Sequence, residues 1–336
     1  MKVLFECRIP YRFWHGGMQL QIGKTKAALE KLGVEVDYFR WWDTRQGGDL
    51  MHFWGKAPVA LIRAAQEHGM PVLINPYLTA ACNHSDLKLA CETVVRRVIS
   101  SIPIGKKLAE ALDWTSYRAA NHAVVLLEPA KKVLVWEYGV SPAQVSVVPL
   151  GLSDIFRQAG PAPRTESHLI CTGTINPRKR SVELAEMARA AEAPILFVGK
   201  PYAETEPYWK RFRSLIDDRW VKYHPHVETD SEMVRLLQSA RGYVLMSIWE
   251  DWSATAHEAA ACGLPLLLPD QNWSRDRYGS QVRYFTTRYS RRRNTEILRQ
   301  FYQDSPSLLP PNVRFHSWPE IAQQLRSIYE SMCASH

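Results

Sequence analysis

Residues 247–264 read S-I-W-E-D-W-S-A-T-A-H-E-A-A-A-C-G-L and hold two glutamates, Glu250 and Glu258, eight positions apart. Glu250 follows an apolar run, Gly242–Trp249, which is typical of a buried strand. Glu258 lies in a run of small residues that starts after Ser253, a favourable helix N-cap, and ends at the G-L-P of residues 263–265. The stretch therefore predicts a strand followed by a helix, with one carboxylate at the junction and another about two turns into the helix.

Such a junction can bind a phosphate. Small residues at the start of a helix let a ligand approach the free N–H groups and the positive end of the helix dipole. We expect Trp252–Thr255, with Ser253 and Ala254 between them, to hold phosphate oxygens. Glu258 and Glu250 could accept hydrogen bonds from sugar hydroxyls on either side of it. The spacing alone is also met by two unrelated glutamates, so that interpretation stays open here.

The same alternation of short apolar runs and amphipathic segments continues through the chain and predicts βαβ units with parallel sheets. A stretch rich in proline and glycine, Gly160–Thr165, interrupts it and reads as a linker. We predict an α/β protein with two Rossmann-like domains facing a central cleft. The predicted domains are residues 1–160, residues 165–315, and a C-terminal helix within 316–336 that returns to the first domain.

The predicted strands are Lys2–Glu6, Val34–Phe39, Leu50–Trp54, Pro71–Asn75, His122–Leu127, Val145–Pro149, Leu169–Thr172, Ile195–Gly199, Val221–His224, Tyr243–Ile248, Leu264–Leu268 and Val282–Phe285. The predicted helices are Met18–Leu32, Pro58–His68, one within Ser85–Leu112, Pro129–Tyr138, Ser181–Ala191, Pro207–Ile216, Asp230–Ser239, Ala254–Cys262, Thr295–Tyr302 and Trp318–Met332.

Composition agrees with two soluble domains and favours anionic partners. The 336 residues carry a formal net charge of +8. Nucleotides, phosphates and an anionic membrane face suit that sign, as does a generally basic surface. The cluster of Arg288 and Arg291–Arg293 is expected to be a solvated face rather than a nucleic-acid site. No C-x-x-C pair, signal peptide or membrane-length apolar run occurs, so reduced thiols and a cytoplasmic location are expected.

The stretch around the two glutamates resembles the E-x(7)-E motif of retaining GT-B glycosyltransferases, in particular glycosyltransferase family 4. The match covers Ser247, Glu250, Glu258 and the G-x-P at 263–265, while Asp251-Trp252-Ser253 replaces the Gly-Phe-Gly of the family. The resemblance implies that Glu258 binds the nucleotide ribose and that Glu250 contacts the donor sugar. It also implies that the amides of Trp252–Thr255 hold the distal phosphate.

A second resemblance lies after the first strand of the C-terminal half. The segment C-T-G-T-I-N-P-R-K-R, residues 171–180, resembles the G-R-L-x-x-x-K-G segment whose cations neutralise the donor diphosphate. Lys179 matches its lysine and Thr174 stands where its arginine would be. Arg178 or Arg180 could supply the missing charge. Without the resemblance, the same residues read as a charged loop.

In the N-terminal half the resemblance is thinner. Gly16 and Gly17 resemble the family's glycine loop on the acceptor side. His52 is retained from a D-x-x-H-x-H pattern, and Tyr77 stands where many relatives have an active-site histidine. The resemblance therefore implies catalytic roles for His52 or Tyr77. A structural histidine is the alternative for His52.

The implied activity is transfer of a sugar, with retention, from a UDP- or GDP-sugar to a hydroxyl acceptor, a glycan or lipid-linked glycan of cell-surface polysaccharide synthesis. No cofactor and no metal are expected, since the sequence has no D-x-D. His224 and His226 lack a third ligand, and His226 is assigned to the donor side. Peripheral contact with an anionic membrane is expected, and nucleic acid is not. A nucleotide-sugar 2-epimerase and a non-catalytic sugar-nucleotide-binding protein remain alternatives. A dehydrogenase is disfavoured because no G-x-G-x-x-G follows a strand.

Overall fold

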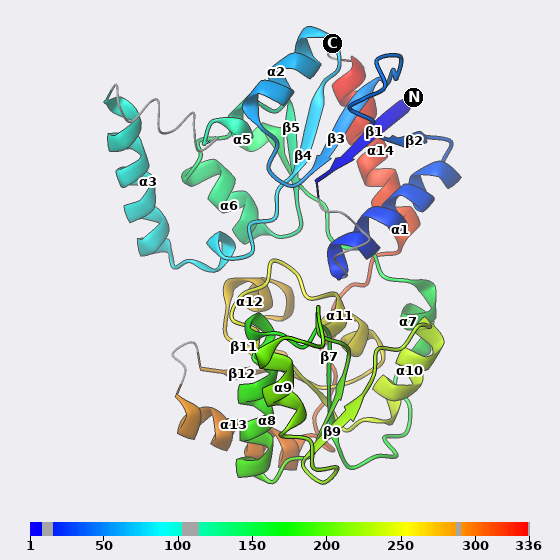
Figure 1. Cartoon of the computed structure of the whole chain (residues 1–336), viewed down its shortest axis with the longest axis vertical. Helices are drawn as coiled ribbons and strands as arrows, with labels where there is room; N and C mark the ends of the chain where they lie inside the picture. The colour runs from blue at the N-terminus through cyan, green and yellow to red at the C-terminus, as the bar shows by residue number, and fades with distance from the viewer. Residues whose placement is uncertain (9–15, 103–113, 287–289, 335–336) are drawn as a thin grey trace. The chain divides into compact units, whose positions relative to one another are not determined.

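The computed structural model describes residues 1–8, 16–102, 114–286 and 290–334, and its chain forms two compact units (Figure 1). The first unit comprises Met1–Gly151 together with His316–His336, and the second comprises Leu152–Phe315. Each unit has its own parallel sheet and its own apolar core. The predicted pair of Rossmann-like folds is therefore confirmed.

The first unit contains a six-stranded sheet, in the described residues, with strand order β2-β1-β3-β4-β5-β6. Every pairing in it is parallel. The strands are β1 (Lys2–Cys7), β2 (Glu35–Tyr38), β3 (Leu50–Trp54), β4 (Val72–Asn75), β5 (His122–Val125) and β6 (Val145–Val147). The helices are α1 (Gly17–Lys31), α2 (Val59–Glu67), α3 (Asp86–Ser101), α5 (Ser116–Ala119), α6 (Glu128–Trp136) and α14 (Trp318–Ala334), with short 3-10 turns at Ala81–Asn83 and Pro142–Gln144.

The last helix completes the first unit. Figure 1 shows α14, in red, beside α1, in blue, and these two helices pack closely. Its buried side chains, including Ile321, Leu325 and Tyr329, face the sheet because they recur at helical spacing. The chain thus leaves this unit after Gly151, whose Cα lies so close to Trp318 that a Cβ there would approach the indole ring to 2.6 Å.

The second unit also contains a six-stranded sheet in its described part, with strand order β12-β11-β10-β7-β8-β9. All its pairings are parallel. The strands are β7 (Leu169–Thr172), β8 (Ile195–Val198), β9 (Val221–His224), β10 (Tyr243–Val244), β11 (Leu266–Pro269) and β12 (Arg283–Phe285). The helices are α7 (Asp154–Ala159), α8 (Ser181–Ala191), α9 (Pro207–Arg213), α10 (Asp230–Ser239), α11 (Ala254–Ala261), α12 (Asn272–Tyr278) and α13 (Arg291–Asp304), with a 3-10 turn, η3, at Pro177–Lys179.

Strand order in the second unit marks a place for a ligand. From β7 the chain proceeds outward through β8 and β9, and it then returns to the other side of β7 to form β10, β11 and β12. The direction of winding reverses between β7 and β10. In open parallel sheets, ligands bind outside the carboxyl ends of the strands at this switch point. The loops after β7 and β10 are therefore the candidate ligand-binding segments of this unit.

Three differences from the predicted elements concern the site or the described range. The predicted strand Tyr243–Ile248 pairs in the sheet only at Tyr243–Val244, and α12 was not predicted. Beyond residue 102, the predicted helix within Ser85–Leu112 lies outside the described residues, as does Arg288. Within the described ranges, no helix combines the length and apolar character needed to cross a bilayer.

Candidate functional site

The loop between β7 and α8 presents two cations at the switch point of the second unit. Asn176 caps the η3 turn, because its side-chain oxygen accepts a hydrogen bond from the amide of Lys179 at 2.9 Å. The turn ends at Arg180, whose backbone adopts a left-handed conformation with φ 54°. This short turn fixes the backbone of Arg178 and Lys179, so their side chains leave the strand end from a defined position.

Both cations bind the first of the two glutamates. The Lys179 ammonium lies 2.5 Å from Glu250 Oε1, and Arg178 Nη1 lies 2.7 Å from the same oxygen. Glu250 is only 5% exposed. Burial alone would raise the pKa of its carboxyl, but Lys179 and then Arg178 outweigh burial and hold that pKa below its usual value. Glu250 is therefore ionised at neutral pH and orders both cations.

Backbone contacts join the same two loops. The amide of Ile248 donates to the carbonyl of Arg178 at 2.8 Å, and the Arg178 guanidinium donates to the carbonyl of Trp249 at 3.0 Å. This explains the short β10. The amide of Leu245 still donates to the Leu267 carbonyl at 3.0 Å, and beyond it the chain bonds to the β7–α8 loop instead of extending the sheet. The loops after β7 and β10 consequently form one hydrogen-bonded unit.

The start of α11 is built as expected for an anion site. Ser253 is the N-cap, and its hydroxyl accepts from the amide of Ala256 at 3.3 Å. Thr255 is fixed by a 2.7 Å hydrogen bond with the buried Tyr243 hydroxyl. Among the described residues, no acceptor is found for the amides of Ala254 and Thr255. These amides are the donors that a phosphate would use.

Glu258 has a different environment from Glu250. It lies on α11, half-buried, and no hydrogen bond or ion pair within the described chain engages its carboxyl. Burial, and then the charge of Asp230, raise the pKa of Glu258 to about 8. A carboxyl group that lacks a protein partner and is held partly protonated is typical of a binding site rather than of a structural ion pair.

Two further residues of the site were not predicted. Asp251, beside Glu250, has a pKa raised to about 6 by burial and by the neighbouring carboxylate. Arg277 projects from α12, bonds to the Arg314 carbonyl, and lies over the Trp252 ring at 5.3 Å. Its Nη2 is 3.3 Å from His257 Nε2, and burial lowers its pKa. Arg277 therefore fixes Trp252, the aromatic residue that stands in place of the phenylalanine of the motif.

The remaining predicted donor residues are less constrained. Thr174 lies half-buried in the loop after β7, and His226 is exposed after β9. The Nδ1 atom of His224 is 2.7 Å from the carbonyl oxygen of Pro225. In the described part of the chain, no group of three or more His, Cys, Asp or Glu side chains is arranged to hold a metal ion.

The backbone of Gly199 lies close to Gly173, where the loop that carries Arg178 and Lys179 begins, and this contact holds the loop in place. Gly199 ends β8 with φ +155°, and a Cβ there would lie 1.9 Å from the carbonyl oxygen of Gly173. We expect Gly199→Ala to lower the free energy of unfolding by about 3 kcal/mol or more, because backbone rather than a flexible side chain must move. Urea denaturation measures this. The control is Gly279→Ala, at φ +55° with no atom within 4 Å, which should cost only about 1–2 kcal/mol. Equal costs for the two variants would contradict the role of this close approach.

In the first unit, the structure places His52 in the core of the sheet. Its side chain is fully buried, stacks on Trp54 at 4.2 Å, and lies 2.7 Å from the Tyr329 hydroxyl through Nδ1. Burial lowers the pKa of His52 to about 3. An imidazole enclosed in this way fills a core position and joins α14 to the sheet, so the function proposed below gives it no catalytic part.

Tyr329→Phe tests that structural role. Removing the hydroxyl leaves the buried Nδ1 of His52 unpaired, and its Nε2 has no partner among the described residues. We expect a loss of about 1–3 kcal/mol in unfolding free energy, measured by urea denaturation. Tyr38→Phe, at an exposed tyrosine, should change it by less than about 0.5 kcal/mol. A loss of activity with unchanged stability in Tyr329→Phe would contradict the structural role.

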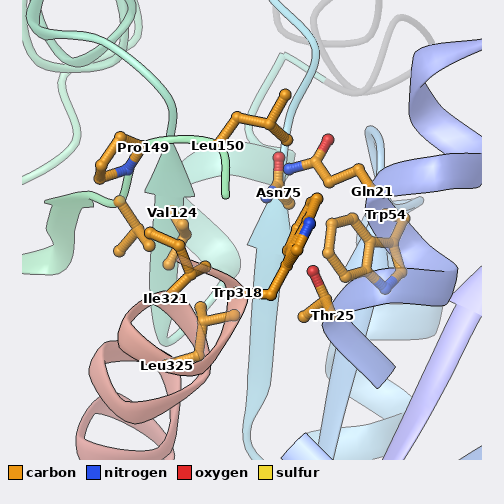
Figure 2. Close-up of a pocket in the computed structure, with 11 residues that line it drawn as sticks. Gln21, Thr25, Trp54, Asn75, Val124, Pro149, Leu150, Trp318, Ile321 and Leu325 are labelled. Atoms are coloured by element: carbon orange, nitrogen blue, oxygen red, sulfur yellow. The ribbon is translucent and has the colours of Figure 1, made fainter. Parts of the chain in front are cut away.

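The other predicted residues of the first unit lie at the carboxyl edge of its sheet. Tyr77 is half-buried just after β4, and Gly16 and Gly17 are exposed at the start of α1. Figure 2 shows a small cavity at the same edge, lined by Trp318 and by Trp54 and Asn75, which end β3 and β4. The Trp54 Nε1 and Asn75 Oδ1 atoms are buried in its wall without a protein partner in the described chain. The structure thus gathers Arg178, Lys179, Glu250, Trp252, Ser253, Ala254, Thr255 and Glu258 around one strand edge of the second unit, with Gly16, Gly17, His52 and Tyr77 in the first.

Solved structures share this architecture. Sucrose-phosphate synthase from Thermosynechococcus elongatus has a TM-score of 0.73 at 14% identity, with all of both chains covered (100% and 100%). HepE from Anabaena, in complex with UDP-glucose, has a TM-score of 0.61 at 15% identity, covering 98% of this chain and 100% of that one. The lipopolysaccharide outer core galactosyltransferase WaaB has a TM-score of 0.61 at 12% identity over the same shares. No family model and no curated protein matches the sequence. The chain therefore has the GT-B fold.

Proposed function

We propose that this protein is a retaining glycosyltransferase that moves a sugar from a UDP- or GDP-sugar to a hydroxyl acceptor. The observation that supports the proposal most is the pairing of Lys179 and Arg178 with Glu250 at the switch point of the second unit. The open amides of Ala254 and Thr255 start α11 at the same strand edge. Cations and amides together suit a diphosphate, whose negative charge increases as the sugar leaves.

The two glutamates fit the two ends of such a donor. Glu258, which has no partner in the described part of the chain, can accept hydrogen bonds from the two hydroxyls of a ribose. Glu250 can turn from the cations toward hydroxyls of the donor sugar when the diphosphate takes its place on Lys179 and Arg178. Glu258 then gains its partners in the complex, whereas Glu250 exchanges its two cations for sugar hydroxyls.

Retention of configuration follows from a front-face reaction. The acceptor hydroxyl attacks from the side that the diphosphate leaves, and the departing phosphate oxygen takes the hydroxyl proton. No strong protein base is needed, so positioning and charge stabilisation account for catalysis. The proposal includes no metal and no cofactor.

Two structures of similar fold hold UDP or a UDP-sugar. HepE was solved in complex with UDP-glucose, and a pneumococcal O-GlcNAc transferase in complex with UDP and GlcNAc. These complexes support UDP-sugars as the first donors to test. A thermal-shift screen with UDP, GDP, ADP and their sugars is the direct experiment, because a ligand that binds only the folded protein raises its melting temperature. At 100 times the dissociation constant, the stabilisation is about 2.7 kcal/mol. No shift with any member of the panel would refute the proposal.

We further propose a cytoplasmic enzyme in peripheral contact with an anionic membrane, acting on a glycan or lipid-linked acceptor of polysaccharide synthesis. The support is a stripe of exposed aliphatic side chains on one face of α3, at helical spacing. It consists of Leu87, Val94, Val95 and Val98, with Ile102 just after the helix, and Arg97 lies beside it.

We expect the double variant Val94→Glu, Val98→Glu to lower binding to phosphatidylglycerol vesicles at least about tenfold in a co-sedimentation assay, because it removes apolar area and adds negative charge. Leu309→Glu, at an exposed leucine of the second unit, is the control and should bind as the wild type does. Equal vesicle binding by all three proteins would exclude α3 as the contact.

A further inference from the structure

Two adjacent tryptophans stand exposed after β2 in the first unit. Trp41 and Trp42 are 81% and 64% exposed, the highest values of any tryptophan in the described residues. They are the central residues of a turn that closes with a 2.9 Å hydrogen bond from the Asp43 amide to the Arg40 carbonyl. Their rings lie 5.5 Å apart and nearly perpendicular, at 89°. In this edge-to-face arrangement the two indoles cover part of each other, and most of their remaining surface is presented to solvent.

Hydrogen bonds and ion pairs hold the backbone of this turn, so the exposure of the tryptophans is a built feature. The Gln46 side chain accepts from the Arg40 amide at 2.7 Å, and it donates to the Tyr38 carbonyl at 2.8 Å and to Asp37 at 3.0 Å. The Arg40 guanidinium pairs with Asp37 at 2.8 Å and with Asp43 at 3.1 Å. These contacts fix the backbone on both sides of the tryptophans. Large exposed apolar groups held on a fixed frame mark an interaction site.

The surrounding charges favour a neutral, hydroxyl-rich ligand. Between residues 37 and 49 there are three aspartates and two arginines, so the segment has a net negative charge. An anionic membrane would be attracted to the opposite sign. A sugar ring, by contrast, places apolar C–H groups against an aromatic face, and its hydroxyls bond to carboxylates and guanidinium groups at the rim.

The position of the turn agrees with a substrate role. β2 pairs with β1, and the Phe39 amide bonds to the Phe5 carbonyl at 2.9 Å. The Trp41–Trp42 turn therefore follows the carboxyl end of β2, at the edge of the sheet where β1 leads toward Gly16 and α1. Carboxyl edges of parallel sheets are where ligands bind.

We propose that Trp41 and Trp42 form a stacking platform for the pyranose rings of a neutral glycan. The assignment of this glycan as the acceptor of the transfer rests on the proposed function, whereas glycan binding itself does not. The platform binds sugar units of the glycan rather than the hydroxyl that reacts. It therefore sets the affinity for the acceptor and leaves donor binding unchanged.

The test measures binding to an array of immobilised neutral oligosaccharides, followed by fluorescence titration with the oligosaccharides that are retained. The wild-type protein should retain at least one, and Trp41→Ala, Trp42→Ala should weaken that binding roughly tenfold or more. Gln46→Ala, which keeps both indoles but loosens the turn, should weaken it less. Trp136→Ala, at an exposed tryptophan of α6, is the matched control and should bind as the wild type does.

Thermal shift with the nucleotide panel separates this inference from the proposed function. An unchanged nucleotide shift in the Trp41–Trp42 variant, with lost glycan binding, supports the platform. If glycan binding depends on Trp41 and Trp42 but no nucleotide stabilises the protein, the stacking platform is supported and the proposed glycosyltransferase function is refuted. Any of three results would overturn the platform. The wild type binds no oligosaccharide, the double variant binds oligosaccharides as well as the wild type does, or the double variant loses binding to phosphatidylglycerol vesicles but not to oligosaccharides.

Discussion

Lys179→Ala is expected to lower turnover by about 100- to 1,000-fold, the usual cost of losing one group that stabilises transition-state charge. The ammonium is the cation closest to Glu250, at 2.5 Å, and we assign it to the oxygens of the leaving diphosphate. Initial rates with the donor and acceptor found by the screens provide the measurement. Michaelis constants for the donor should change less than the turnover number, because the leaving group gains charge mainly in the transition state.

Two variants control for folding and for general loss of charge. Lys210→Ala removes an exposed lysine from α9 and should keep full activity. Lys179→Arg keeps the cation and the pairing with Glu250, and should retain more turnover than the alanine variant. Melting temperatures of all three should be compared, since Lys179→Ala also removes an ion pair from the buried Glu250 and leaves its pairing with Arg178. Near-normal turnover in Lys179→Ala would remove this residue from the phosphate site.

Glu258→Gln is expected to weaken nucleotide-sugar binding about 10- to 100-fold, since hydrogen bonds to a charged group contribute about 1.5–3 kcal/mol. It should also remove a pH dependence. The free carboxyl has a pKa raised to about 8, whereas a bound ribose donates to its ionised form. Wild-type affinity should therefore rise with pH up to about 8 and then level off, while the affinity of Glu258→Gln should stay flat.

Calorimetry in buffers of different ionisation enthalpy gives a second readout. With the bound carboxyl fully ionised, binding at pH 7 should release most of one proton from the wild type and none from Glu258→Gln. A nucleotide-sugar is the right probe, because its diphosphate does not titrate in this range. The free energy of unfolding of the unliganded protein should depend on the same proton. Between pH 4.5 and about 8 the folded state keeps the Glu258 carboxyl protonated, whereas the unfolded state has lost that proton. The contribution of Glu258 to stability therefore falls as pH rises through that window. Affinity that is independent of pH in the wild type would contradict the role of Glu258.

Much of the fold could be predicted because buried parallel strands are continuous apolar runs. Strands Leu50–Trp54 and Leu169–Thr172 agree with the structure residue for residue. So do the half-buried edge strand Val221–His224, which is not such a run, and helices Ser181–Ala191 and Asp230–Ser239. Helix α12 could not be predicted in this way. It has seven residues, and its capping box uses Gln271 at the cap and Ser274 at the third position, the reverse of the usual order.

The candidate site, like the fold, could be predicted only in part. Its residues could be named from local patterns, since each pattern lies within one loop or one helix. The pairing of Lys179 with Glu250 spans 71 positions and depends on which way two side chains turn, which no local pattern records. Arg277 was missed for a related reason. Its contact with Trp252 exists only because α12 places it there, and α12 itself gave no clear signal.

The ion pairs of Glu250 have a consequence for selectivity. With an internal anion already on both cations, we expect a simple inorganic phosphate to gain little by entering, because it would have to displace the buried carboxylate of Glu250 from Lys179 and Arg178. A whole donor differs, since its sugar offers the evicted group new partners. If the proposed function holds, we therefore expect the unliganded site to discriminate against small anions and to respond to a complete nucleotide-sugar.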